Sequence, residues 1–166
     1  MKDKLLVEAV ETLLNKNIKY EYDSAFIYYG MSSWLASSGF LHGAKLFKKY
    51  GDEELSHAHK VTDYLIDRNC NAIIPDVTKA SIEFTDVKDI LLKSYDHEKQ
   101  VEDNWKIVAN TAFKNLDHMT YDLALWFIRE QREEVVKFRN LLDKLEALSG
   151  LTGSNYFIDE EFKKYI

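Results

Sequence analysis

Residues 50–61 read YGDEELSHAHKV, and this stretch decides the fold because it places two polar groups on the apolar face of a helix. Glu54 and His57 are three residues apart, so on a helix they lie one above the other on one face. A carboxylate buried beside an imidazole requires a salt bridge, a raised pKa or a metal ion. On this spacing alone a solvated face stays open as well. The apolar positions of the same helix recur at Leu46, Phe47, Ala58, Val61 and Leu65.

Composition places the chain among globular proteins. With 166 residues it is expected to form one domain over 1–166, long enough to bury a core. Apolar residues make up 46% and charged residues 30%, and the net charge of -6 gives no electrostatic case for binding nucleic acid. Cys70 is the only cysteine, which excludes an internal disulfide and favours a cytoplasmic location. No stretch of the sequence is long and apolar enough to span a membrane, so no membrane partner is expected.

Helical periodicity predicts four long helices. Pro75 is the only proline and the chain has six glycines, so long uninterrupted helices can form. Short breaks at 37–39 and 115–117 imply two antiparallel helix pairs. Residues 154–166 are expected to form a short fifth helix. The four long helices are predicted over Leu5–Ala36, Leu41–Arg68, Asp86–Lys114 and 118–149.

The segment Asn69–Thr85 decides how the two pairs join. It carries Pro75 and β-branched residues without a helical period, so we predict a long connection. A helix of about 28 residues is roughly 42 Å long, and about 13 extended residues cover that length. The connection can therefore return along the bundle and make the second and third helices parallel. The expected fold is all-α, a four-helix bundle with one long crossover and a short fifth C-terminal helix.

Each long helix turns polar at one level of its inward face. Glu21 lies about as far before the first turn as Glu54 lies after it. Glu98 stands in the same relation to Gln131 and Glu134 across the second turn. With no Lys or Arg expected inward at that level, about four negative charges would be uncompensated unless divalent cations balance them. Oxygen ligands with one imidazole favour iron, or manganese, over a closed zinc site.

Several motifs are spread over the whole chain: Tyr20-Glu21-Tyr22 with Tyr28, Glu53-Glu54-Leu55-Ser56-His57, Tyr95-Asp96-His97-Glu98, Trp126 with Glu130-Gln131-Arg132-Glu133-Glu134, and Tyr156-Phe157-Ile158-Asp159. Together these motifs resemble those of bacterial non-haem ferritins. The resemblance implies iron storage with ferroxidase activity, in which Fe(II) is oxidised by O2 or H2O2 at a di-iron centre. The product is kept as a ferric oxyhydroxide mineral in a hollow shell of 24 copies of the chain, and no haem is expected.

The same resemblance implies a set of iron ligands. A first iron would bind Glu21, Glu54 and His57, and Glu54 would bridge to a second. Bacterial relatives often have the run Glu-Gln-His-Glu-Glu-Glu where this chain has residues 130–135. Arg132 and Val135 depart from that run, and they place a cation and an apolar group beside a third iron site that the resemblance also implies. The catalytic residues so implied are Glu21, Tyr28, Glu54, His57, Glu98, Gln131 and Glu134. A third iron site is implied at Glu53, Glu130, Glu133 and Glu134.

A helical bundle with these residues is compatible with functions other than iron storage. Di-iron oxygenases and reductases repeat Glu-x-x-His on the second helix pair, whereas this chain has Gln131-x-x-Glu134, which indicates a site that releases oxidised iron. The main alternative is a di-iron oxidoreductase or peroxidase of the rubrerythrin type, against which the missing second Glu-x-x-His and the missing Cys-x-x-Cys both stand. A DNA-binding mini-ferritin would lack the fifth helix, and a purely structural bundle is the remaining reading.

The other histidines have ordinary explanations. His59 is two positions from His57, so it is expected on the solvated face of the helix. His97 is expected beside the site or at the surface rather than as a ligand. His42 and His118 stand at helix ends, where capping or exposure accounts for them.

Overall fold

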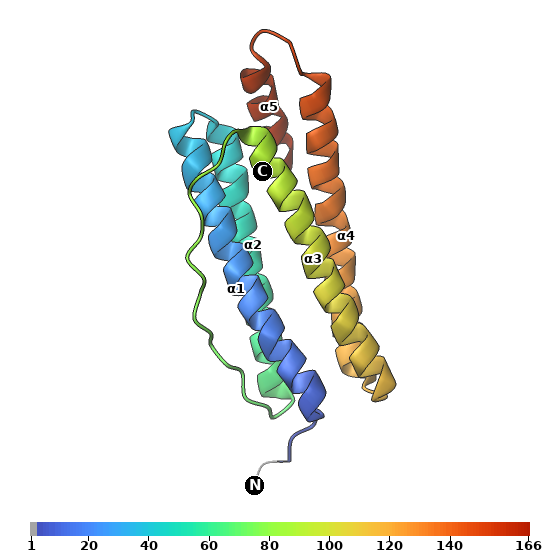
Figure 1. Cartoon of the computed structure of the whole chain (residues 1–166). Coiled ribbons are helices and arrows are strands. Elements are labelled where there is room, and N and C mark those ends of the chain that lie inside the picture. Colours follow the sequence, from blue (N-terminus) through green and yellow to red (C-terminus); the bar gives the residue numbers. More distant parts are fainter. Residues whose placement is uncertain (1–2) are drawn as a thin grey trace.

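The computed structural model describes residues 3–166, which form an all-α bundle of four long helices and a short fifth one, as predicted (Figure 1). The long connection runs along the outside of α1 in Figure 1, and it makes α2 and α3 parallel. No helix within 3–166 has an apolar stretch of the length needed to span a membrane. The elements are α1 (Glu8–Ser37), α2 (Leu41–Asp67), α3 (Val87–Lys114), α4 (His118–Ala147), α5 (Ser154–Phe162) and a 3-10 turn (Lys163–Tyr165).

The helix ends differ from the predicted ones by a few residues. α1 begins at Glu8 rather than at Leu5, because the Leu5 N–H donates to the Arg68 carbonyl at 3.1 Å and ties this segment to the end of α2. α4 ends at Ala147, two residues before the predicted Ser149. α5 ends at Phe162, after which the chain tightens into the 3-10 turn instead of remaining α-helical to its end.

The crossover is attached to α1 by side chains of that helix. Asn15 Oδ1 accepts a hydrogen bond from the Ile73 N–H at 2.7 Å, and Asp23 Oδ1 accepts one from the Thr78 N–H at 2.7 Å. These bonds satisfy backbone groups that have no strand or helix partner. Asp86, at the end of the crossover, caps α3, because its Oδ1 accepts a hydrogen bond from the Asp89 N–H at 2.8 Å.

The fifth helix closes one end of the bundle. α2 has no local side-chain cap, and its free amides of His42 and Gly43 donate to Asp159 of α5 at 3.2 and 2.9 Å. A Cβ at Gly43 would come within 2.9 Å of the Phe162 ring, so glycine allows the close approach of the two helices. α5 therefore supplies the cap that the start of α2 requires.

The core divides into two apolar clusters with a polar layer between them. One cluster lies toward α5 and includes Phe47 and Phe138, and the other lies toward the opposite end and includes Leu14 and Trp105. On each long helix the polar position lies between residues of the two clusters. The buried members of this layer are Glu21, Glu54, His57, Glu98 and Gln131.

Candidate metal centre

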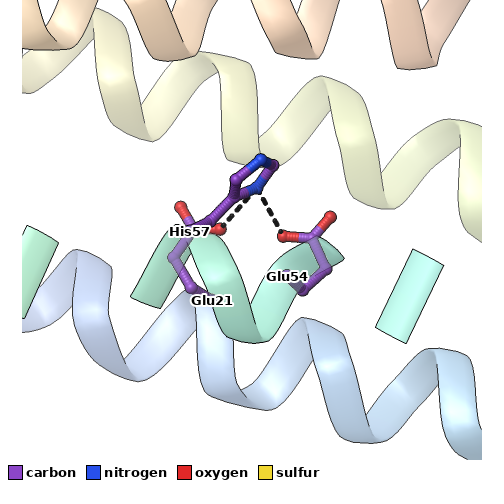
Figure 2. Close-up of side chains that lie close together, drawn as sticks. All are labelled: Glu21, Glu54 and His57. Carbon is purple, nitrogen blue, oxygen red and sulfur yellow. Dashed lines mark hydrogen bonds and ion pairs between the residues drawn. The ribbon is translucent and has the colours of Figure 1, made fainter. Parts of the chain in front are cut away.

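Glu21, Glu54 and His57 form a compact group in the polar layer. Each offers one ligand atom, and these atoms all lie within 4.8 Å of one another. His57 Nδ1 is 3.2 Å from Glu54 Oε2 and 3.7 Å from Glu21 Oε2, and Figure 2 shows the imidazole reaching both carboxylates. Glu54 and His57 are one turn apart on α2, and Glu21 comes from α1. Within residues 3–166 this is the one cluster of three or more His, Cys, Asp or Glu side chains with that spacing.

The protonation of Glu54 and that of His57 depend on each other and on the charge of Glu21. Burial raises the pKa of Glu54, the hydrogen bond to His57 opposes this rise, and the Glu21 charge adds to it. Burial lowers the pKa of His57, but its interactions with the carboxylates of Glu21 and Glu54 outweigh burial and the net shift of the pKa is upward. Ligands must give up their protons to bind a metal. A cation that bound this group would therefore displace protons from it.

A second group, from α3 and α4, adjoins the first. Glu98 and Gln131 are almost fully buried, with 1% and 0% exposure. Burial raises the pKa of Glu98 well above its ordinary value, and the charges of Glu134 and Glu21 add to the rise. Glu98 and Glu134 do not belong to the group of side chains whose ligand atoms all lie within 4.8 Å of one another. The centre thus consists of a tight triad and a looser second half.

Unpartnered polar atoms test whether this layer suits a cation. Glu21 Oε2, Glu98 Oε2 and Glu134 Oε2 are buried and accept no hydrogen bond from residues 3–166. The amide atoms Oε1 and Nε2 of Gln131 are also buried and have no hydrogen-bond partner within residues 3–166. Buried polar groups without partners are rare and destabilising, and oxygen atoms are the ligands that hard cations prefer. The residues present therefore fit divalent or trivalent metal ions such as iron.

One expectation about this layer was wrong. No Lys or Arg was expected inward at its level, but Lys137 Nζ lies 2.6 Å from Glu134 Oε1. Lys137 is half-buried, at the edge of the inward face of α4. The spacing of three residues between Glu134 and Lys137 is the sequence signal that could have revealed the pair.

A cavity of about 380 Å³ opens beside the triad on the side of α2 and α4. Of the residues predicted for a third iron site, the structure brings Glu53, Glu130 and Glu134 to this cavity. Glu133 is exposed and does not line it. The remaining residues that line the cavity are Ser56, His57, Lys60, Trp126 and Lys137.

Trp105 supports the triad in a way that sequence analysis did not identify. Its Nε1 donates to Glu21 Oε1 at 2.9 Å, and its ring stacks on Phe127 with centroids 3.8 Å apart. In the sequence Trp105 is one apolar position among many on its helix. Only the fold shows that its N–H reaches a carboxylate of another helix.

Tyr28 and His97 lie on the α5 side of the centre. Tyr28 is 1% exposed, and its hydroxyl has no hydrogen-bond partner within 3–166. His97 meets the Tyr28 ring edge-on at 6.0 Å, and its Nε2 is 2.7 Å from Ser24 Oγ. Burial lowers the pKa of His97. His97 therefore lies beside the centre, whereas His59 is exposed, as expected.

Comparison with known proteins links this geometry to one family. Residues 11–148 match the ferritin-like domain family. The chain is 30% identical over 149 residues to a bacterial non-heme ferritin of Escherichia coli O6:H1, covering 89% of this chain and 90% of that one. It is 29% identical over 163 residues to a bacterial non-heme ferritin of Campylobacter jejuni, covering 98% and 96%. An open pore ferritin from Archaeoglobus fulgidus superposes with a TM-score of 0.91 at 25% identity, covering 95% and 96%.

Proposed function

The chain belongs to the ferritin family, and on that premise we propose that it stores iron and oxidises Fe(II) as it takes the metal up. The observation that carries the proposal is the buried triad of Glu21, Glu54 and His57, with its ligand atoms within 4.8 Å of one another. The neighbouring unpartnered oxygens of Glu98 and Glu134 support it. A rubrerythrin-type oxidoreductase is not favoured, because the matched relatives described above are ferritins.

In the proposed reaction two Fe(II) ions bind as substrates in each chain. One binds Glu21, Glu54 and His57, and the other binds between Glu54, Glu98 and Glu134, near Gln131. Carboxylates stabilise Fe(III) more than Fe(II), so this ligand set favours loss of an electron from each ion. When O2 is the oxidant it takes both electrons and two protons and becomes H2O2, and H2O2 can serve as oxidant in its turn.

The neutral side chain of Gln131 explains why the product leaves. An amide oxygen adds no charge to the ligand set, so it holds Fe(III) less strongly than a carboxylate does. We propose that oxidised iron passes to the cavity lined by Glu53, Glu130 and Glu134, where a third ion binds on the way to the mineral. Glu133 adds negative charge nearby: burial lowers the pKa of Lys137, but the hydrogen bond to Glu134 and the charges of Glu134, Glu53 and Glu133 raise it.

Storage requires a compartment, and we propose that 24 copies of the chain enclose it. Leu116 is 76% exposed at the α3–α4 turn, and Phe113 and Met119 are both 61% exposed beside it. Exposed apolar groups that gather at one place mark surfaces between protein molecules. Contacts between copies would cover these side chains.

The proposal is tested by iron loading of the intact protein. Anaerobic Fe(II) titration, aerobic loading and sizing should show iron far beyond a few ions per chain that elutes with the assembled protein. His57→Ala should assemble normally but lose the fast oxidation phase, since it removes the only imidazole of the triad. His59→Ala is the matched control, because His59 is exposed two residues away.

Two outcomes would contradict this reading. Uptake that stops at a few ions per chain would favour a di-iron enzyme over a storage protein. Oxidation at the wild-type rate in assembled His57→Ala protein would show that the triad is not the place of oxidation.

A further inference from the structure

Lys137 lies at the open side of the second half of the centre, where its amine contacts a predicted iron ligand. The distance from Lys137 Nζ to Glu134 Oε1 is 2.6 Å, and the side chains are 34% and 14% exposed. The other carboxylate oxygen, Glu134 Oε2, is buried and unpartnered among residues 3–166. One oxygen of Glu134 is therefore held by an ammonium group, and the other is available within the bundle.

The charge of Lys137 reaches beyond this pair. It opposes the rise in the pKa of Glu98 that burial, Glu134 and Glu21 produce. It also lies 5.9 Å above the centre of the Tyr50 ring. Lys137 is thus a positive charge fixed between α2 and α4, next to the carboxylates proposed for the second iron.

An ammonium group and a divalent cation compete for the same carboxylate. Positive charges about 4 Å apart repel one another strongly at the edge of a protein interior, so Lys137 and a metal ion are not both accommodated at Glu134. The lysine side chain is long and lines the cavity that also contains Glu53 and Glu130. These two carboxylates can receive its amine when it leaves Glu134.

We propose that Lys137 is an internal counter-cation that holds Glu134 until a metal ion binds the second half of the centre and displaces it. This inference rests on the proposed function, because it concerns the same centre. Among the described residues no lysine or arginine pairs with Glu21 or Glu54. Their partner is the His57 imidazole, which is itself a proposed ligand and does not have to leave, so this half fills first. The second ion binds more weakly and leaves more easily, since the lysine returns to Glu134 when it goes.

Lys60 provides a matched control within the same cavity. Its Nζ lies 4.3 Å above the centre of the Trp126 ring, and no ion pair joins it to any residue in the described range 3–166. Lys137→Met and Lys60→Met remove the same charge from the same cavity with side chains of similar length. Only Lys137→Met frees Glu134.

The experiment is anaerobic calorimetric titration of the assembled, metal-free protein with Fe(II), and separately with the redox-inert ion Zn(II). The wild type should bind two ions with unequal affinity. Lys137→Met should tighten the second binding step about tenfold and leave the first within about twofold. Lys137→Arg, which keeps the cation, and Lys60→Met should both resemble the wild type. The melting temperature of the metal-free Lys137→Met protein should fall, and its rise on adding Zn(II) should exceed that of the wild type.

The outcomes separate this inference from the proposed function. If the wild type binds neither ion, the proposed function fails. If the wild type binds two ions but Lys137→Met leaves the second step unchanged, the counter-cation role is refuted while the centre stands. If Lys60→Met tightens the second step as much as Lys137→Met does, the effect is general cavity charge and the specific pairing with Glu134 is not its cause.

Discussion

Trp105 Nε1 donates a 2.9 Å hydrogen bond to Oε1 of Glu21, and this bond joins α3 to α1 at the candidate metal centre. Both side chains are fully buried. A partner that hydrogen-bonds a metal ligand fixes the ligand's orientation before the metal arrives. The second oxygen of Glu21 has no such partner within 3–166, so the bond leaves one oxygen oriented toward His57 and available to a cation.

Trp105→Phe should therefore weaken both the apo fold and metal binding at the triad. Phenylalanine keeps an aromatic ring on Phe127 but removes the donor, and an unsatisfied buried oxygen costs about 1–3 kcal/mol. We expect a lower melting temperature of the metal-free protein and a roughly tenfold weaker first Zn(II) step by calorimetry. Trp126→Phe is the control, because Trp126 lines the cavity without a hydrogen bond to a carboxylate among the described residues. Equal affinity in Trp105→Phe and wild type would show that this bond does not orient Glu21.

Glu98→Gln should raise the melting temperature of the metal-free protein at neutral pH. Burial, with the charges of Glu134 and Glu21, raises the pKa of Glu98 well above its ordinary value of 4.5. When a carboxyl group has a higher pKa in the folded state than in the unfolded state, the folded protein loses stability as the pH rises from the unfolded-state pKa toward the folded-state pKa. The advantage of the glutamine should therefore be greatest at neutral pH and shrink on acidification to about pH 4.

Metal binding provides the second readout for Glu98→Gln. The extra stabilisation that Zn(II) gives the wild type should be much smaller in the variant, because a ligand charge is lost. Thermal melts with and without Zn(II), from about pH 4 to 8, measure both effects. A melting temperature that fell at neutral pH, with the Zn(II) effect intact, would mean that a cation already compensates Glu98.

Gln131→Glu should slow repeated turnover and increase iron retention. The amide of Gln131 is fully buried and unpartnered among the described residues, and a carboxylate in its place adds a ligand charge at the second half of the centre. We expect a normal first oxidation phase, slower mineral growth over many turnovers, and more iron left on the protein after treatment with a chelator. Unchanged multiple-turnover kinetics would contradict the role of Gln131 in product release.

Asp159→Ala should loosen the start of α2 without affecting the candidate metal centre. Asp159 accepts hydrogen bonds from the His42 and Gly43 amides, and loss of such a cap costs about 0.5–2 kcal/mol. The melting temperature should fall, and hydrogen exchange at these two amides should accelerate. Asp122→Ala, an exposed acid on α4, is the control. Full protection of the His42 and Gly43 amides in the variant would show that α2 is capped by other means.

Periodicity in the sequence determined the four long helices, their pairing and the crossover. A strict 3.6-residue spacing of apolar side chains defines one buried face, and the breaks at 37–39 and 115–117 define the antiparallel turns. The same spacing placed Glu21 level with Glu54, and Glu98 level with Gln131, because antiparallel helices of equal rise match residues equidistant from a turn. The assignment of these residues as iron ligands remains a prediction.

Tertiary structure alone decided which side chains contact the candidate centre and which one caps α2. Lys137 follows Glu134 by three residues, a spacing that permits an ion pair, but only the fold shows that the amine turns to Glu134 instead of staying in solvent. Trp105 and Asp159 act on helices far from them in sequence, at Glu21 and at Gly43. Periodicity indicates which face of a helix is buried. Whether a hydrogen bond forms also depends on the rotamer of the side chain and on the distance between the two helices. Those depend on how the helices pack, and only the folded chain contains that information.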